Sequence, residues 1–93
     1  MSLNEQSAIV ASKEQLSHDL AGEVAILSLT NGVYYGLDPV GARVWNLIQE
    51  RKTFAELRDT LLAEYEVDAA GLEADLRDLL GQLAEQQLIE ITA

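Results

Sequence analysis

The period of the apolar residues changes at Asp38 and Pro39, and this change constrains the fold more than any other feature of the chain. Before it lie short runs of β-branched and aromatic residues bounded by turn residues, a pattern typical of strands. After it, apolar residues recur every three to four positions, which predicts amphipathic helices. Strands that precede helices along the chain indicate an α+β protein.

The first part of the chain is predicted to hold three strands, at residues 8–11, 23–29 and 33–37. The polar stretch 12–18, which includes His18, is predicted to form a loop or a helical turn. Asn31 and Gly32 separate the second and third strands. Both residue types accept the positive φ of a tight two-residue turn, so we expect these two strands to be antiparallel neighbours.

Three helices are expected after the change of period, each with a recognisable N-terminus. Asp38 is a good N-cap with Pro39 at the first helical position, Thr53 and Glu56 form a capping box, and Asp68 is the expected third cap. The third helix carries an apolar stripe of five leucines: Leu72, Leu76, Leu79, Leu80 and Leu83. Residues 88–91 are predicted to form a terminal extended segment.

Charge and composition exclude several classes of function. The chain of 93 residues has the length of one domain and a net charge of −10, which repels nucleic acid and anionic lipid. It lacks Cys and has one His, so a thiolate metal site and a cysteine nucleophile are excluded. With no secretion signal and no apolar run of about 20 residues, a cytoplasmic protein is expected.

The helical part also has the outline of a winged-helix DNA reader. Residues 53–93 hold ten of the 16 acidic residues and only two of the six basic ones, so such a helix would meet phosphates with carboxylates. A winged-helix DNA-binding regulator is therefore the alternative, and a dimerisation module is a third possibility.

Several blocks together resemble the PqqD-like proteins, over about residues 9–91. They are Gly22-Glu23, the stretch 34–45 (YYGLDPVGARVW), 53–57 (TFAEL), 65–68 (YEVD) and 74–76 (ADL). The resemblance implies a three-stranded antiparallel sheet packed on a winged-helix-like bundle of three helices. It also implies one peptide-recognition domain over residues 1–93, with strands over about 8–37 and the bundle over 38–91. Gln87 stands where many relatives have Gly after the third helix.

The resemblance also implies a function. PqqD-like proteins bind the leader segment of a ribosomally made precursor peptide as an added strand, and this sequence is most similar to the free-standing members of lasso-peptide pathways. We therefore expect a non-catalytic adaptor without cofactor or metal, monomeric or homodimeric. Its partners would be the precursor leader, a leader peptidase and a macrolactam-forming cyclase. A chaperone for another modified-peptide pathway is a further alternative.

The resemblance places the peptide between the third strand and the third helix. The expected docking strand is Val33, Tyr34, Tyr35, Gly36 and Leu37, and the expected opposite wall is Asp75, Leu76, Asp78, Leu79, Gln82 and Leu83. Alternation puts Val33, Tyr35 and Leu37 on one face of the strand, where we expect them to be mainly core. The parity of residues whose N–H groups face a peptide is left open by the sequence.

Overall fold

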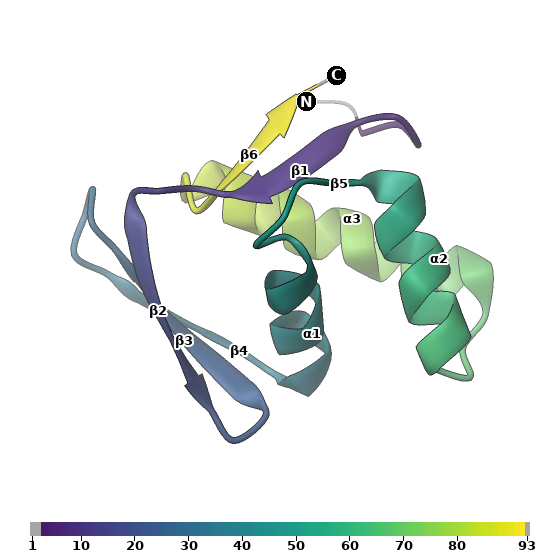
Figure 1. Cartoon of the computed structure of the whole chain (residues 1–93), viewed down its shortest axis with the longest axis horizontal. Helices are drawn as coiled ribbons and strands as arrows, with labels where there is room; N and C mark the ends of the chain where they lie inside the picture. Colours follow the sequence, from purple (N-terminus) through teal and green to yellow (C-terminus); the bar gives the residue numbers. More distant parts are fainter. Residues whose placement is uncertain (1–2, 93) are drawn as a thin grey trace.

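The computed structural model describes residues 3–92 (Figure 1). Its elements are, in order, β1 (Ala8–Ala11), β2 (Gln15–Leu20), β3 (Glu23–Ser28), β4 (Tyr34–Leu37), α1 (Pro39–Leu47), β5 (Lys52–Thr53), α2 (Phe54–Glu64), α3 (Ala69–Glu85) and β6 (Ile89–Thr92). The strands form two antiparallel sheets of three strands, ordered β5-β1-β6 and β2-β3-β4. The predicted α+β class, with a three-stranded antiparallel sheet and three helices, is confirmed.

The β2-β3-β4 sheet differs from the predicted sheet in its first strand. Ala8–Ala11 pairs with β5 and β6, so it belongs to the other sheet. Its expected place is taken by Gln15–Leu20. The prediction of a loop or helical turn around His18 is therefore wrong. Five of the six β2 residues are exposed, so the strand lacks the alternation of burial that a sequence pattern reflects.

The two hairpins of this sheet use different turns. β2 and β3 are joined by Ala21 and Gly22, with φ of 54° and 92°, which is the tight two-residue turn with positive φ at both positions. β3 and β4 are joined by residues 29–33, where Gly32 has φ of 71° and the side chain of Asn31 accepts a hydrogen bond from the Val33 N–H. The antiparallel pairing of these strands is confirmed, but the predicted two-residue turn at Asn31 and Gly32 is wrong.

The predicted helix starts are confirmed. The Asp38 side chain accepts a hydrogen bond of 2.8 Å from the Gly41 N–H, and Pro39 occupies the first turn of α1. Thr53 and Glu56 form the complete capping box of α2. Asp68 caps α3 through the Gly71 N–H at 2.8 Å. Because Asp38 directly follows β4, its cap fixes the path from that strand into α1.

Gln87 ends α3 in the left-handed conformation, with φ of 61°. The Gln87 N–H donates to the Ala84 carbonyl and the Leu88 N–H to the Leu83 carbonyl, both at 3.0 Å. This pair of bonds is a Schellman motif, in which Gly normally occupies the left-handed position. The turn sends the chain into β6.

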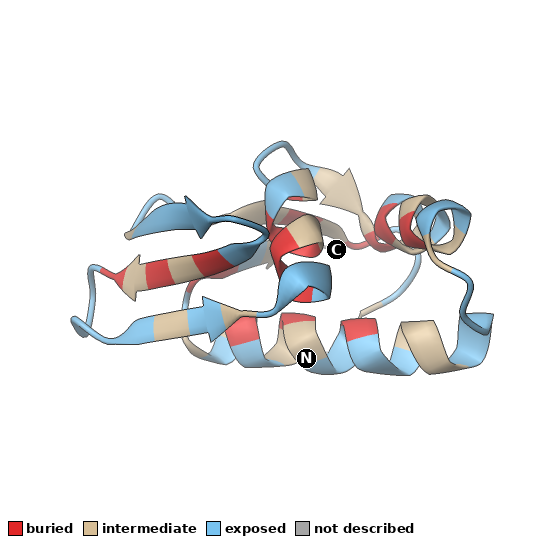
Figure 2. Ribbon diagram, turned by 90° about the horizontal axis from the view of Figure 1, so that it is seen from below, coloured by how far each residue is buried: buried red, intermediate tan, exposed pale blue. Residues whose placement is uncertain are grey.

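The core lies between the three helices, the inner face of the β2-β3-β4 sheet and the β5-β1-β6 sheet, which contributes Ile9 and Ile89 (Figure 2). α1 is its centre, since Val44 and Trp45 are buried and the helix packs against β3. The largest fully buried apolar side chains are Trp45, Phe54, Ile9, Ile26, Ile48, Leu57, Leu61, Leu80, Leu88 and Val44. Burial of a side chain of this size contributes about 1.5–3 kcal/mol.

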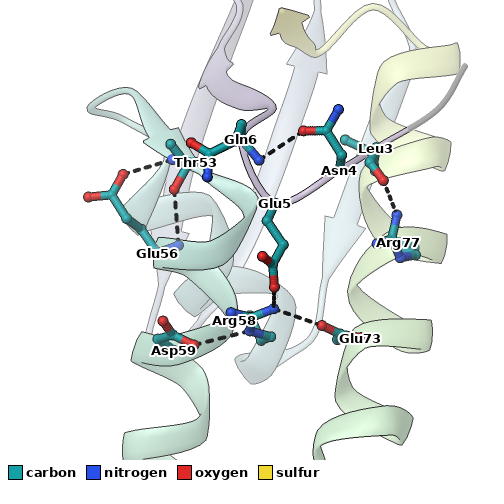
Figure 3. Close-up of polar contacts among 10 residues, drawn as sticks. All are labelled: Leu3, Asn4, Glu5, Gln6, Thr53, Glu56, Arg58, Asp59, Glu73 and Arg77. Atoms are coloured by element: carbon teal, nitrogen blue, oxygen red, sulfur yellow. Dashed lines mark hydrogen bonds and ion pairs between the residues drawn. The ribbon is translucent and has the colours of Figure 1, made fainter. Parts of the chain in front are cut away.

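Arg58 joins the N-terminal segment to α2 and α3 (Figure 3). Its guanidinium contacts the carboxylates of Glu5, Asp59 and Glu73. These hydrogen bonds, that to Glu5 foremost, raise the pKa of Arg58 above its usual range. The Arg77 guanidinium likewise donates to the Leu3 carbonyl. The network connects the front half of α3 to the rest of the protein.

Candidate functional site

β4 presents a free backbone edge, because within residues 3–92 it pairs only with β3. The Ser28 N–H donates to the Val33 carbonyl at 2.9 Å, so these two residues face each other at a hydrogen-bonded position of the ladder, although the Val33 N–H itself donates to Asn31. In an antiparallel ladder the bonded pairs alternate along the strand. Tyr35 and Leu37 therefore direct their backbone groups to β3, whereas Tyr34 and Gly36 direct theirs to the free edge. The structure thus supplies the parity that the sequence left open.

The side chains of β4 alternate as the sequence suggested, with one exception. Tyr35 and Leu37 are half-buried and pack against the core, whereas Tyr34 and Gly36 are exposed. Val33, predicted to be mainly core, is 47% exposed. It lies in the loop before β4, outside the strand whose alternation the prediction assumed, so that part of the prediction is wrong.

A hollow of about 560 Å³ separates the end of β4 from α3. Buried Val44, Leu61 and Leu76 form part of its lining, which makes the hollow largely apolar. The full lining is Gly36, Leu37, Asp38, Val40, Gly41, Val44, Leu61, Leu72, Asp75, Leu76, Leu79 and Gln82. A space of this size accepts one or two apolar side chains of a bound chain.

A second hollow of about 200 Å³ continues along the same strand toward the C-terminal end of α3. Its lining is Tyr35, Gly36, Leu37, Leu79, Gln82, Leu83, Glu85 and Gln86, so four residues line both hollows. The Tyr35 hydroxyl donates to the Gln86 side-chain oxygen at 2.5 Å, which connects β4 to the end of α3. We refer to the two hollows together as the β4–α3 groove.

Most of the predicted wall residues lie in this groove. Asp75, Leu76, Leu79 and Gln82 line the first hollow, and Leu79, Gln82 and Leu83 line the second. Asp78 is exposed and lines neither. Of the docking-strand residues, Tyr35, Gly36 and Leu37 line the groove, while Val33 and Tyr34 do not.

α1 and α2 also contribute to the groove, which was not predicted from the sequence. Val40, Gly41 and Val44 of α1 and Leu61 of α2 line the first hollow. Val40 is 44% exposed, although it recurs with Val44, Leu47 and Ile48 at helical spacing and so belongs to an apolar stripe along α1. Val40 directly follows Pro39 in the first turn of the helix. An apolar residue at that position is the sequence signal that could have indicated its place in the groove.

The groove is acidic. Asp38 and Asp75 line the first hollow and Glu85 the second, and none of the lining residues is Lys, Arg or His. A cleft lined by one sign of charge favours a ligand of the other sign. Over residues 3–92, no three His, Asp or Glu side chains gather into a group that could hold a metal ion.

Comparisons with known proteins agree with this architecture. Residues 23–89 match the family described as coenzyme PQQ synthesis protein D (PqqD). The match covers more than half of the chain, so the chain belongs to the PqqD family. No similar sequence is found among curated proteins.

A solved structure is similar to nearly the whole chain. It is "TbiB1 in Complex with the TbiA(beta) Leader Peptide", with 43% identity over 87% of this chain and 94% of that chain, and a TM-score of 0.82. That protein was therefore captured with a leader peptide bound. Separately, no helix within residues 3–92 is long and apolar enough to cross a membrane.

Proposed function

We propose that this protein is a non-catalytic adaptor of lasso-peptide biosynthesis, which binds the leader segment of a ribosomally made precursor by strand addition at β4. The observation that carries the proposal is the free edge of β4 beside an apolar hollow. Family membership and the similarity to TbiB1 in its leader complex support it. As the resemblance of the sequence implies, the adaptor would deliver the leader to a leader peptidase and a macrolactam-forming cyclase.

The recognition has two parts. The backbone groups of Tyr34 and Gly36 pair with the leader irrespective of its side chains, as in other cases of strand addition. Alternate leader side chains then point toward α3, where Leu76 and Leu79 offer apolar surface. Backbone pairing supplies affinity, and the groove selects the sequence.

The charges of the groove add a second criterion. Asp75 is exposed at the lip of the first hollow. A Lys or Arg of the leader beside it would be attracted, whereas an acidic leader residue would be repelled. We propose a leader that combines an apolar anchor with a basic neighbour.

Titration of a synthetic leader against Leu79→Ala tests the proposal. Leu79 lines both hollows, and loss of part of an apolar contact worth about 1.5–3 kcal/mol should weaken binding about tenfold. Leu47→Ala is the matched control, because Leu47 is also half-buried against the core but lines neither hollow. Calorimetry should show weaker binding for the first variant and unchanged binding for the second. Equal affinities of both variants would contradict the proposed site.

A further inference from the structure

α3 contacts the rest of the protein with two different sides. Leu72, Leu76 and Leu79 line the β4–α3 groove. Glu73 and Arg77 are four positions apart, so they share another side of the helix, and they line neither hollow. That side faces α2 and the N-terminal segment (Figure 3). Contacts outside the groove therefore help to place its wall.

Two arginines cross the junction between α2 and α3 in opposite directions. The Nη1 atom of Arg58, on α2, is 3.0 Å from a carboxylate oxygen of Glu73, on α3. The guanidinium of Arg77, on α3, lies 4.6 Å from the ring centroid of Phe54, the first residue of α2, which is a cation–π contact. We call these four residues the α2–α3 clamp.

The N-terminal segment, residues 3–7, joins the clamp from a third direction (Figure 3). Glu5 accepts a hydrogen bond of 2.5 Å from Nη1 of Arg58, and the Leu3 carbonyl accepts one from Arg77. Backbone hydrogen bonds from the first two residues of α2 hold the segment in place. None of residues 3–7 lines either hollow, so the segment braces the two helices without entering the groove.

Arg58 neutralises the acidic residues that meet at this junction. Its guanidinium contacts the carboxylates of Glu5, Asp59 and Glu73, and its side chain is only 17% exposed. Without the cation, the three carboxylates would repel one another. Since Asp59 lies on α2 and Glu73 on α3, this repulsion would move the two helices apart.

The first hollow of the groove lies across the same junction. Leu61 of α2 and Leu72 and Leu76 of α3 are part of its lining. Each of these leucines is within three residues of a member of the α2–α3 clamp along its own helix. Because close-packed protein interiors transmit displacements, a change in the spacing of α2 and α3 changes the width of the hollow.

We propose that the α2–α3 clamp sets the width of the first hollow and thereby how tightly an apolar side chain of the leader is held, with Arg58 as the positioning residue. This inference rests on the proposed function. The backbone pairing of the leader takes place at β4, away from the clamp. Loss of the clamp should therefore weaken the side-chain part of recognition and leave the backbone part intact.

Two carboxylates that share the Arg58 guanidinium provide the first test. Glu73→Gln breaks a contact between the helices, whereas Asp59→Asn breaks a contact within α2, at the same distance of 3.0 Å and with the same change of charge. Calorimetric titration with the synthetic leader should show about threefold weaker binding for Glu73→Gln and unchanged binding for Asp59→Asn. Equal affinities of the two variants would overturn the inference.

A double-mutant cycle between Arg58→Met and the leader separates positioning from a general loss of structure. The apolar anchor of the leader is the residue whose replacement by Ala weakens binding to the wild type but not to Leu79→Ala. Arg58→Met should bind the unchanged leader about tenfold more weakly, but the Ala leader, which no longer fills the hollow, less than about twofold more weakly. Arg43→Met, which removes an ion pair of 2.6 Å between α1 and α2, is the control and should bind both leaders as the wild type does.

The outcomes distinguish this inference from the proposed function. Equal losses for both leaders, or an unchanged affinity of Arg58→Met for the unchanged leader, would overturn the clamp, and leader binding at β4 would stand. If the wild-type protein binds no leader, the proposed function fails and the inference fails with it. Circular dichroism monitors folding; should Arg58→Met not fold, the comparison of Glu73→Gln with Asp59→Asn decides.

Discussion

Asp75 and Asp78 are three positions apart on α3, but only Asp75 lines the β4–α3 groove. Both are exposed carboxylates on the same helix. They therefore form a natural pair for testing whether the charge of the groove takes part in leader recognition, because any general effect of the protein's negative charge acts on both.

We predict that Asp75→Asn reduces the salt dependence of leader binding and that Asp78→Asn does not. An exposed ion pair contributes about 0.2–1 kcal/mol, so the affinity at low salt should fall a few-fold. Titration of the synthetic leader at two salt concentrations measures the difference. Identical behaviour of the two variants would mean that Asp75 belongs to a solvated acidic face and takes no part in leader recognition.

Gln87 is a residue in a conformation that suits Gly. A left-handed conformation costs a non-glycine residue about 1–2 kcal/mol, and Gly removes most of this cost. We predict that Gln87→Gly stabilises the protein by about 1 kcal/mol and raises Tm by about 4–8 °C. Glu85→Gly, inside the last turn of α3, should lower Tm. Thermal denaturation by circular dichroism decides; a lower Tm for Gln87→Gly would show that the α3–β6 turn is formed differently.

At the scale of the element, neighbouring residues of β4 direct their backbone groups to opposite sides of the strand. The backbone of Tyr34 faces the free edge, and that of Tyr35 pairs with Ile26. Pro removes a backbone donor, which an edge strand tolerates only where that donor faces outward. Substitution by Pro at Tyr34 and, separately, at Tyr35 should therefore distinguish an effect on leader binding from an effect on protein stability.

We predict that Tyr34→Pro weakens leader binding and has little effect on stability, whereas Tyr35→Pro lowers stability by about 1–3 kcal/mol, because a buried carbonyl of β3 loses its partner. Tyr34→Ala and Tyr35→Phe are the controls, since they remove the ring or the hydroxyl but keep the backbone N–H. Calorimetry and urea denaturation measure the two effects. Loss of binding in Tyr34→Ala as large as in Tyr34→Pro would assign recognition to the ring instead of the backbone.

The predictability of each element depended on how local its determinants are. The caps at Asp38, Thr53 and Asp68 involve contacts within four residues, and the sequence predicts all three helix starts. β2 is stabilised by pairing with β3, and its exposed residues carry no periodic pattern, so it was missed. The turn at Ala21 and Gly22 was missed because Ala seldom adopts positive φ, so residue type did not indicate a two-residue turn there.

At the scale of the whole molecule, the site could be predicted only in part. The sequence, through its resemblance to a family, indicated which strand and which helix face each other across the groove. It did not reveal that Val40 and Leu61 complete the lining or that Asp78 lies outside it, because these facts depend on how α1, α2 and α3 pack together. Tertiary packing, which brings distant residues together, has no local signal in the chain.

Within residues 3–92, the β2-β3-β4 sheet has two free strand edges, those of β2 and β4, and we propose that the leader binds at β4. The β4 edge adjoins an apolar hollow and α3, whereas five of the six β2 residues are exposed. The register places the backbone groups of Ser17 and Asp19 on the outer edge of β2, just as Tyr34 and Gly36 face outward on β4. Amides at the two edges are therefore internal controls for each other.

Amide hydrogen exchange with and without the synthetic leader, resolved by residue with NMR, tests the central claim most directly. With the leader at 100 times its Kd, the Tyr34 and Gly36 amides should exchange about a hundredfold more slowly, because they are accessible only in the unbound fraction. The Ser17 and Asp19 amides should keep their rates. Slower exchange at Ser17 and Asp19, or bound leader that leaves Tyr34 and Gly36 unchanged, would contradict strand addition at β4.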